Sequence, residues 1–328
     1  MVLRNVGQAR DDHTLEGHMR GTTWVVAGTA AVVALGSCGG GDSGGPNGGG
    51  SGFTAKVDGV SWEALPISIA ANAIAGLPGA LLVLGTDNST GSSRSITITL
   101  QNISGPGTYA LGVGSDVIGG IGLYGEAGEG WITENTGMAG TVILTTLTAD
   151  RIAGTFEYDA DPGNNNNVGG TRRVTQGRFD LPFTGTLVPV PANVGSEVSA
   201  TFGGDPYNAW SVNGLLQDHL GGAGFQFSSS TKEHGLSVLL SGVTAPGTYT
   251  INHMSPVRSI GAGRNGGDAD HCCWGGGGSA LDVGTITITS LTPGRVRGTL
   301  TATLQPSPGT AATTPLVITD AEFNVGIQ

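Results

Sequence analysis

The run with the most chemically versatile side chains is Asp268-Ala269-Asp270-His271-Cys272-Cys273-Trp274. Cysteine, histidine and aspartate are common ligands of zinc and copper, so a metal site is one hypothesis. Adjacent cysteines rarely share one tetrahedral ion, and a catalytic thiol would need a neighbouring base that the sequence does not reveal. In an oxidising environment a disulfide at Cys272 and Cys273, vicinal or between chains, is the simpler outcome. We therefore predict a disulfide or a plain loop here, and we assign no metal, cofactor or catalytic residue to the chain.

A second polar run, from Asp159 to Asn167, is rich in the oxygen ligands that calcium prefers. Its spacing departs from that of an EF-hand loop, and no glutamate closes it. Aspartate, asparagine, glycine and proline are also typical of hairpin tips. We therefore predict that this run is the tip of a long hairpin.

Aromatic side chains suggest a third kind of site. Tyr124, Trp131 and Trp274 fall in glycine-rich connections, where we expect them to be exposed. Because aromatic rings offer a large contact area, such loops could hold a sugar. Aromatic residues make up only 5% of the chain, and one or two per loop more often cover the edge of a core. Carbohydrate binding therefore stays an open alternative.

The charge balance bears on the partners. The chain has 14 lysines and arginines against 25 aspartates and glutamates, which gives a net charge of −11. Nucleic-acid backbones are bound by clustered basic side chains, and Arg172-Arg173 is only an isolated pair. We therefore expect no nucleic acid as a partner. No phosphate-binding loop of the Gly-x-x-x-x-Gly-Lys type is present either, so nothing local indicates an enzyme.

The N-terminal region has the features of an export signal. After Met19 and one arginine, the apolar stretch from Thr22 to Leu35 is shorter than the roughly 20 residues that cross a bilayer. Leu35-Gly36-Ser37-Cys38 resembles the bacterial lipobox, in which cleavage precedes a cysteine whose thiol receives a diacylglyceryl group. We predict that residues 1–37 are a signal region with Met19 as the true start, and that Cys38 is the lipid attachment site.

Residues 38–52 follow as the lipidated cysteine and a glycine-rich linker. Such a segment cannot bury a core, and it acts as a flexible tether between a membrane anchor and a folded domain. In lipoproteins of two-membrane bacteria, a glycine after the cysteine, here Gly39, favours the outer membrane. We therefore expect an exported outer-membrane lipoprotein of the cell envelope, with the membrane as a partner through Cys38.

An internal repeat determines the domain organisation. Residues 140–156 align without a gap to residues 284–300, with eight of 17 positions identical, at an offset of 144. Upstream, Pro106-Gly107-Thr108-Tyr109 recurs at residues 246–249 at an offset of 140, so four extra residues lie in the second copy. We predict one β domain at 53–188 and a second copy at 196–328.

Alternating hydrophobicity sets the fold class. Ile96, Ile98 and Leu100 alternate with threonines, as expected for a strand with one buried face and one wet face. Glycine and proline punctuate these runs at turns. We predict an all-β chain of two tandem antiparallel domains, each a sandwich or partly closed barrel of about eight strands, with a short helix conceivable at Ala70–Ile74.

Several motifs of the first copy resemble a family of bacterial lipoprotein domains of unknown function. They are Ala55-Lys56-Val57-Asp58-Gly59-Val60-Ser61-Trp62, Gly107-Thr108-Tyr109, Gly154-Thr155-Phe156 and Thr175-Gln176-Gly177-Arg178-Phe179. The second copy departs from the pattern, with Gly203-Gly204 at the first turn, a displaced Trp210 and the ending Ala321-Glu322-Phe323. These motifs are strand and turn signatures, so the resemblance implies a fold and brings no activity.

Together these features favour a lipid-anchored envelope module that is not an enzyme. It would bind a glycan or an envelope protein, or serve as a structural part of the surface. The alternatives are a carbohydrate-binding protein or an envelope hydrolase whose acidic residues come together from distant strands, which a sequence cannot show.

The lipid anchor makes a direct prediction. Cells fed a palmitate analogue should label the wild-type chain in the membrane fraction, because the Cys38 thiol carries the acylated group. The Cys38→Ala variant should lose both the label and the membrane location. A wild-type chain without label would contradict the lipoprotein interpretation.

Overall fold

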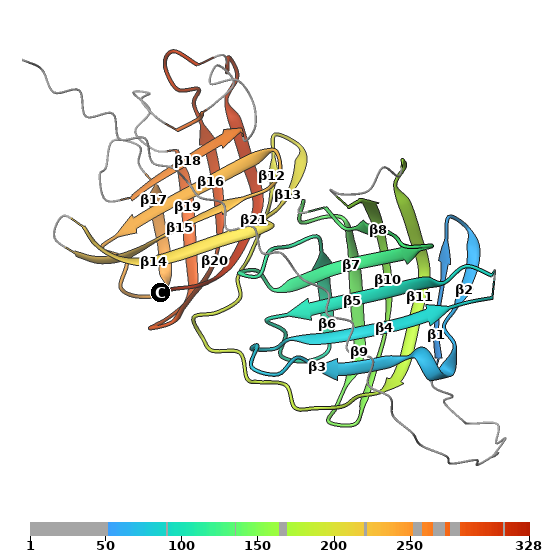
Figure 1. Cartoon of the computed structure of the whole chain (residues 1–328). Coiled ribbons are helices and arrows are strands. Elements are labelled where there is room, and N and C mark those ends of the chain that lie inside the picture. The colour runs from blue at the N-terminus through green and yellow to red at the C-terminus, as the bar shows by residue number, and fades with distance from the viewer. Residues whose placement is uncertain are drawn as a thin grey trace, which may run out of the picture. The chain divides into compact units, whose positions relative to one another are not determined.

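The computed structural model describes residues 52–89, 91–134, 136–163, 169–219, 222–251, 258–264, 273–275, 283–310 and 312–328 (Figure 1). Residues Gly49–Gln328 form one compact unit. The signal region and Cys38 lie outside the described residues. The described part is made of β-strands with one short 3₁₀ turn, η1 (Pro66–Ser68), which confirms the all-β prediction.

Eleven strands lie in the first copy: β1 (Gly52–Val57), β2 (Val60–Glu63), β3 (Ala70–Ala73), β4 (Leu81–Asp87), β5 (Arg94–Gln101), β6 (Gly107–Leu111), β7 (Gly119–Glu126), β8 (Glu129–Ile132), β9 (Gly140–Leu147), β10 (Arg151–Pro162) and β11 (Arg172–Pro182). They pair in the order β2-β1-β11-β10-β9-β6-β7-β5-β4-β3, and β8 pairs with both β7 and β10. A single parallel bridge, Leu111 to Gly120, joins β6 to β7. The strands β6 to β10 therefore curl into a partly closed barrel.

The described residues of the second copy form ten strands: β12 (Glu197–Phe202), β13 (Asp205–Asn208), β14 (Ser211–His219), β15 (Gly222–Ser230), β16 (His234–Ser241), β17 (Gly247–Ile251), β18 (Arg258–Arg264), β19 (Gly284–Thr292), β20 (Arg295–Leu304) and β21 (Leu316–Gly326). Two sheets form, one in the order β13-β12-β21-β20-β19-β17 and one in the order β14-β15-β16-β18. Their inner faces meet in one hydrophobic cluster, which is the arrangement of a β-sandwich.

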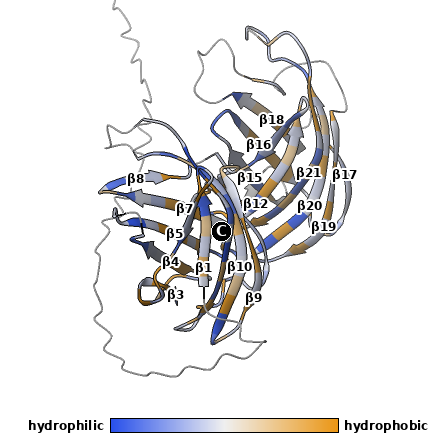
Figure 2. Cartoon of the chain, turned by 90° about the vertical axis from the view of Figure 1, so that its right-hand side faces the viewer, coloured by the Kyte–Doolittle hydropathy of each residue, from blue (hydrophilic) through white to orange (hydrophobic). Residues whose placement is uncertain are grey.

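Strict alternation places one face of each strand in a core. Along β5 the exposure pattern alternates between buried and half-buried at every residue, and β20 alternates between buried residues and residues that are exposed, or half-buried at Arg295. Figure 2 shows these bands of polar and apolar colour along β20 and β21. A side-chain period of two sends the isoleucines and leucines inward and leaves threonines on the outer surface.

The repeat is visible in the strand register. Ala55 pairs with Trp62 across the first hairpin, and Ala200 pairs with Tyr207 across its counterpart. The turn residues Asp58 and Gly59 have φ of 50° and 81°, and both glycines of the second turn also have positive φ. Tyr207, and not the displaced Trp210, therefore stands where the first copy has its motif tryptophan.

The tyrosine of the Pro-Gly-Thr-Tyr motif forms the same hydrogen bond in both copies. The Tyr109 hydroxyl donates to the carbonyl of Gly105 at 2.5 Å, and the Tyr249 hydroxyl donates to that of Ala245 at 2.6 Å. A tyrosine that bonds back to the turn before its own strand is known from other β-sandwiches as a tyrosine corner. Both copies therefore fix the entry to β6 and β17 by the same contact.

The helix considered at Ala70–Ile74 is not formed. Ala70–Ala73 is strand β3, and Ala71 pairs with Val83 of β4. Hydrogen bonding to a buried neighbouring strand outweighs the weak helical preference of a short alanine-rich segment. The short strands β2, β3 and β8 are also the reason why the first copy holds eleven strands among the described residues and not the expected eight.

A buried ion pair closes one end of the first core. Arg94 and Asp87 pair across β5 and β4, with side chains only 5% and 2% exposed. Burial alone would raise the pKa of the Asp87 carboxyl, but hydrogen bonds from Ser89 and from the Arg94 guanidinium more than offset it and lower this pKa. The charged form of Asp87 is therefore part of the native structure.

This ion pair predicts how stability depends on pH. The folded pKa of Asp87 lies below its unfolded value of about 3.9, so its contribution is complete above that pH and is lost as the pH falls through the folded pKa. Asp87→Asn should lower the free energy of unfolding at pH 7 by about 3 kcal/mol, because it leaves Arg94 buried without a counter-charge.

Urea unfolding at pH 7 and at pH 3 measures this effect, with the exposed Asp205→Asn as control. The stability loss on acidification should be smaller for Asp87→Asn than for the wild type. An Asp87→Asn variant as stable as the control would show that the pair does not stabilise the fold.

Candidate functional site

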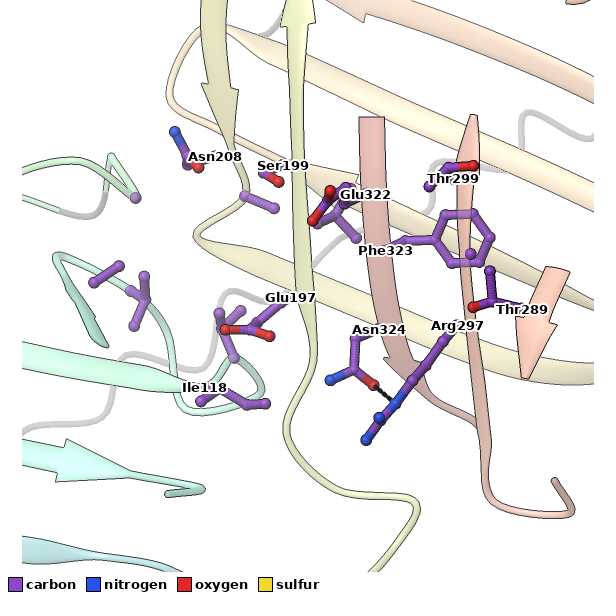
Figure 3. A pocket seen from close by; sticks show the side chains of 17 residues that line it. Ile118, Glu197, Ser199, Asn208, Thr289, Arg297, Thr299, Glu322, Phe323 and Asn324 are labelled. Carbon is purple, nitrogen blue, oxygen red and sulfur yellow. Dashed lines mark hydrogen bonds between the residues drawn. The ribbon is translucent and has the colours of Figure 1, made fainter. Parts of the chain in front are cut away.

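A cleft of about 470 Å³ lies where the two copies meet (Figure 3). It is lined by residues of both copies: Ala110, Val113, Val117, Ile118, Gly137, Glu197, Val198, Ser199, Asn208, Ala209, Thr289, Arg297, Gly298, Thr299, Glu322, Phe323 and Asn324. Its volume falls within the range of small-molecule sites, roughly 300–1,000 Å³. The cleft is therefore the first candidate for a functional site.

The outward face of β12, β21 and β20 forms the floor of the cleft. Glu322 lies opposite Ser199 on β12 and opposite Thr299 on β20, and Glu197 lies opposite Asn324. Because side chains alternate along a strand, these polar groups point into the cleft while Phe323 points into the core. Glu197 and Glu322 are diagonal neighbours on adjacent strands. Residues at such diagonal positions are generally roughly 7–8 Å apart.

A hydrogen-bonded arginine pair borders the floor. The Arg297 Nε donates to Asn324 Oδ1 at 3.1 Å, and the same oxygen accepts from Arg295 at 2.7 Å. In the first copy the equivalents of Arg295 and Asn324 are Arg151 and Asp180, which form an ion pair at 2.6 Å. The second copy thus has an asparagine where the first copy has a carboxylate. Arg297 at the floor therefore donates to the neutral side chain of Asn324 and not to a carboxylate.

Arg295 also holds the connection between the copies. Its guanidinium donates to the carbonyls of Ala192, Val194 and Gly195 at 2.5–2.9 Å. Burial, followed by the neighbouring charge of Arg297, lowers the pKa of Arg295 from its ordinary value. Its three backbone contacts fix the connecting segment next to the floor.

Apolar residues of the first copy form the opposite wall, which we call the lip: Ala110, Val113, Val117 and Ile118. The Asp116 carboxylate positions the lip, since it accepts hydrogen bonds from Ser211 Oγ and from the Val212 amide, each at 2.8 Å. The Gly114 amide donates to the Trp210 carbonyl at 2.7 Å, and the Ile118 amide donates to the Ser196 carbonyl at 2.9 Å. An apolar wall is thereby held over a polar floor.

A second contact between the copies lies beside the cleft. The Lys232 ammonium meets the Glu134 carboxylate at 2.6 Å. Both side chains are largely exposed, so this pair adds little to stability.

The groups at the floor suit hydrogen bonding to a polar ligand. Glu197, Glu322 and Arg297 take part in none of the ion pairs found among the described residues. Carboxylates accept hydrogen bonds, guanidinium and amide groups donate them, and hydroxyls do both. The described residues contain no cluster of three or more histidine, cysteine, aspartate or glutamate side chains that could hold a metal ion.

Of the cysteines, Cys273 is disulfide-bonded. Cys272 and His271 lie outside the described residues, as does Cys38, so the pairing stays a prediction. In the polar run at 159–167, Asp159 and Asp161 belong to β10, where Asp161 accepts a hydrogen bond from Thr171 and Asp159 approaches Arg173. These contacts are those of a hairpin, while residues 164–168 lie outside the described part.

The expectation of exposed aromatic rings is wrong for two of the three residues. Trp131 is 1% exposed and Tyr124 is 2% exposed, because both rings pack inside the first core. The Trp131 Nε1 donates to the Gly170 carbonyl at 3.0 Å, and the Trp274 Nε1 donates to that of Thr314 at 2.9 Å. The two tryptophans are repeat equivalents that tie a loop to the β10 and β20 hairpins, so their role is structural.

Sequence reasoning did not find the cleft. Its residues come from six strands and from loops that are far apart in the chain, and no single local motif contains them. One signal was available: the departure of the second copy from the closing motif, at Ala321-Glu322-Phe323, places Glu322 on the floor. The glutamate at position 322, where the first copy has Arg178, was therefore the available signal in the sequence.

Comparisons with family models, curated proteins and solved structures find no match to this chain. The resemblance to a lipoprotein family of unknown function accordingly stays a prediction. In the part of the chain that the structure describes, no helix has the length and apolar character needed to cross a bilayer.

Proposed function

We propose that this chain is a lipid-anchored envelope protein without catalytic activity, which binds a short neutral saccharide in the cleft between its two copies. The observation that carries the proposal is the cleft itself, which sets an apolar lip over a floor of carboxylates, amides and hydroxyls. A saccharide has the same two-sided chemistry, with C–H faces and a belt of hydroxyl groups.

The charges favour a neutral ligand over an anionic one. Two carboxylates, Glu197 and Glu322, stand on the floor against one guanidinium, and the whole chain has a net charge of −11. An anion would meet repulsion both on approach and in the cleft. The hydroxyl groups of a neutral ligand can donate to each carboxylate and accept from Arg297 and Asn208. Such a ligand satisfies the hydrogen-bonding groups of the floor and brings no net charge.

The expected setting supports the same class of ligand. A signal region, Cys38 and a glycine-rich tether would place the cleft outside the cytoplasm, where envelope glycans are abundant. The cleft volume of about 470 Å³ lies within the range of small-molecule sites, roughly 300–1,000 Å³, which suits a short saccharide. The tether would leave the cleft free to reach them.

An array of unmodified neutral oligosaccharides, probed with the full chain, tests the proposal, and calorimetry then measures the dissociation constant of each hit. Glu322→Gln keeps the shape of the side chain and removes its charge, so it should weaken binding about tenfold, the usual effect of losing one charge-assisted hydrogen bond. Glu63→Gln, on the exposed face of β2, is the matched control and should bind as the wild type does.

Two results would contradict the proposal. The first is an array without any hit, and the second is a hit whose affinity is the same in Glu322→Gln as in the wild type. Binding of lysine-rich peptides in place of sugars would overturn the saccharide assignment while keeping the cleft. Release of cleaved sugar that stops in Glu197→Gln or Glu322→Gln would instead indicate a hydrolase.

A further inference from the structure

The first copy has its own counterpart of the cleft floor. On the outward face of β9, β10 and β11, Thr155 and Arg178 line a hollow of about 680 Å³. Their repeat equivalents, Thr299 and Glu322, lie on the floor of the cleft, where the lip of the first copy faces them. In the second copy, therefore, this surface of the domain is used for contact with a neighbouring domain.

The exposed hollow differs from the cleft floor on strand β9. Ile143 on β9 is 44% exposed, whereas the equivalent residue of the second copy is Thr287. An isoleucine on a face that also carries Thr141 and Thr155 gains by being covered, since burying its side chain removes apolar area from water. Ile143 therefore favours burial against a partner, although this face of the first copy is exposed.

Two opposite charges lie on the two neighbouring strands of the same face, where Ile143 pairs with Thr155 and Thr155 pairs with Arg178. Glu157 on β10 and Arg178 on β11 line the same hollow, and both are exposed. Their repeat equivalents are Thr301 and Glu322. The combination of one carboxylate and one guanidinium at these two positions therefore occurs in the first copy and not in the second. None of the ion pairs among the described residues involves Glu157 or Arg178.

A face with one exposed isoleucine, one carboxylate and one guanidinium is complementary in charge to a second copy of itself. When two such faces meet across a two-fold axis that passes between Glu157 and Arg178, each glutamate lies opposite the arginine of the other chain. A strongly acidic or strongly basic partner would instead meet a like charge. The overall charge of −11 opposes association through surfaces without such compensation.

We propose that the chain forms a two-fold symmetric dimer through the outward face of β9, β10 and β11, with reciprocal Glu157–Arg178 ion pairs about the axis and Ile143 on β9 to one side of them. This proposal is independent of the saccharide cleft, whose floor lies on the second copy and whose lip is formed by other residues of the first copy. On a membrane, two tethered chains would present two clefts side by side.

Light scattering coupled to size-exclusion chromatography of the full chain, over a range of concentrations at low salt, measures the dimer. Arg178→Glu and Glu157→Arg each place like charges opposite one another and should weaken the dimer about tenfold or more. The double variant Glu157→Arg/Arg178→Glu restores opposite charges across the axis and should recover the dimer. Raising the salt concentration should weaken the wild-type dimer, because exposed ion pairs are screened.

Ile143→Thr, which installs the residue of the second copy, should also weaken the dimer. The matched control is Thr287→Ser, on the equivalent face of the second copy, and it should leave the dimer unchanged. A wild-type chain that is monomeric at every concentration overturns the proposal. A dimer that survives both single charge reversals, or that the double variant fails to restore, shows that this face is not the interface.

Discussion

The carboxylate of Asp116 is the contact on which the candidate site depends. It lies in the loop between β6 and β7 of the first copy, yet its two hydrogen-bond donors, Ser211 and the Val212 amide, belong to the second copy. A carboxylate satisfied by two donors at 2.8 Å fixes both the position and the direction of the loop that bears it. Val113, Val117 and Ile118 of the lip lie in that loop, so this carboxylate, together with the Gly114 and Ile118 amides, sets the width of the cleft.

Duplication has kept the contacts that close each domain and changed those that face outward. The tyrosine corners at Tyr109 and Tyr249, and the indole bonds of Trp131 and Trp274, recur at equivalent places. Outside the cores, Arg178 has become Glu322, among other changes. A domain can vary its outward side chains at small cost because they do not pack, and this freedom gives two copies of one fold two different surfaces.

The sequence predicted the all-β class because alternation is a local property: each threonine between two isoleucines reports its own orientation, as along β5. It misplaced Trp131, because a glycine-rich flank suggests an exposed loop, whereas strand β8 carries the ring into the core. The cleft was beyond reach for a different reason. Glu197 and Glu322 are 125 residues apart in the chain, and only the pairing of β12 with β21 brings them together. Local patterns report which way a side chain faces, but not which distant side chain it meets.

Hydrogen–deuterium exchange on the full chain tests most directly whether Asp116 holds the lip over the floor. In the wild type, the amides of Gly114, Ile118 and Val212 should exchange slowly, since each donates to an acceptor across or beside the junction. In Asp116→Ala these three should exchange much faster, while the amides of β5 keep their wild-type rates because the first core is untouched. If the three amides already exchange in the wild type as fast as an exposed loop, the junction is not formed in solution, and the cleft cannot be the functional site.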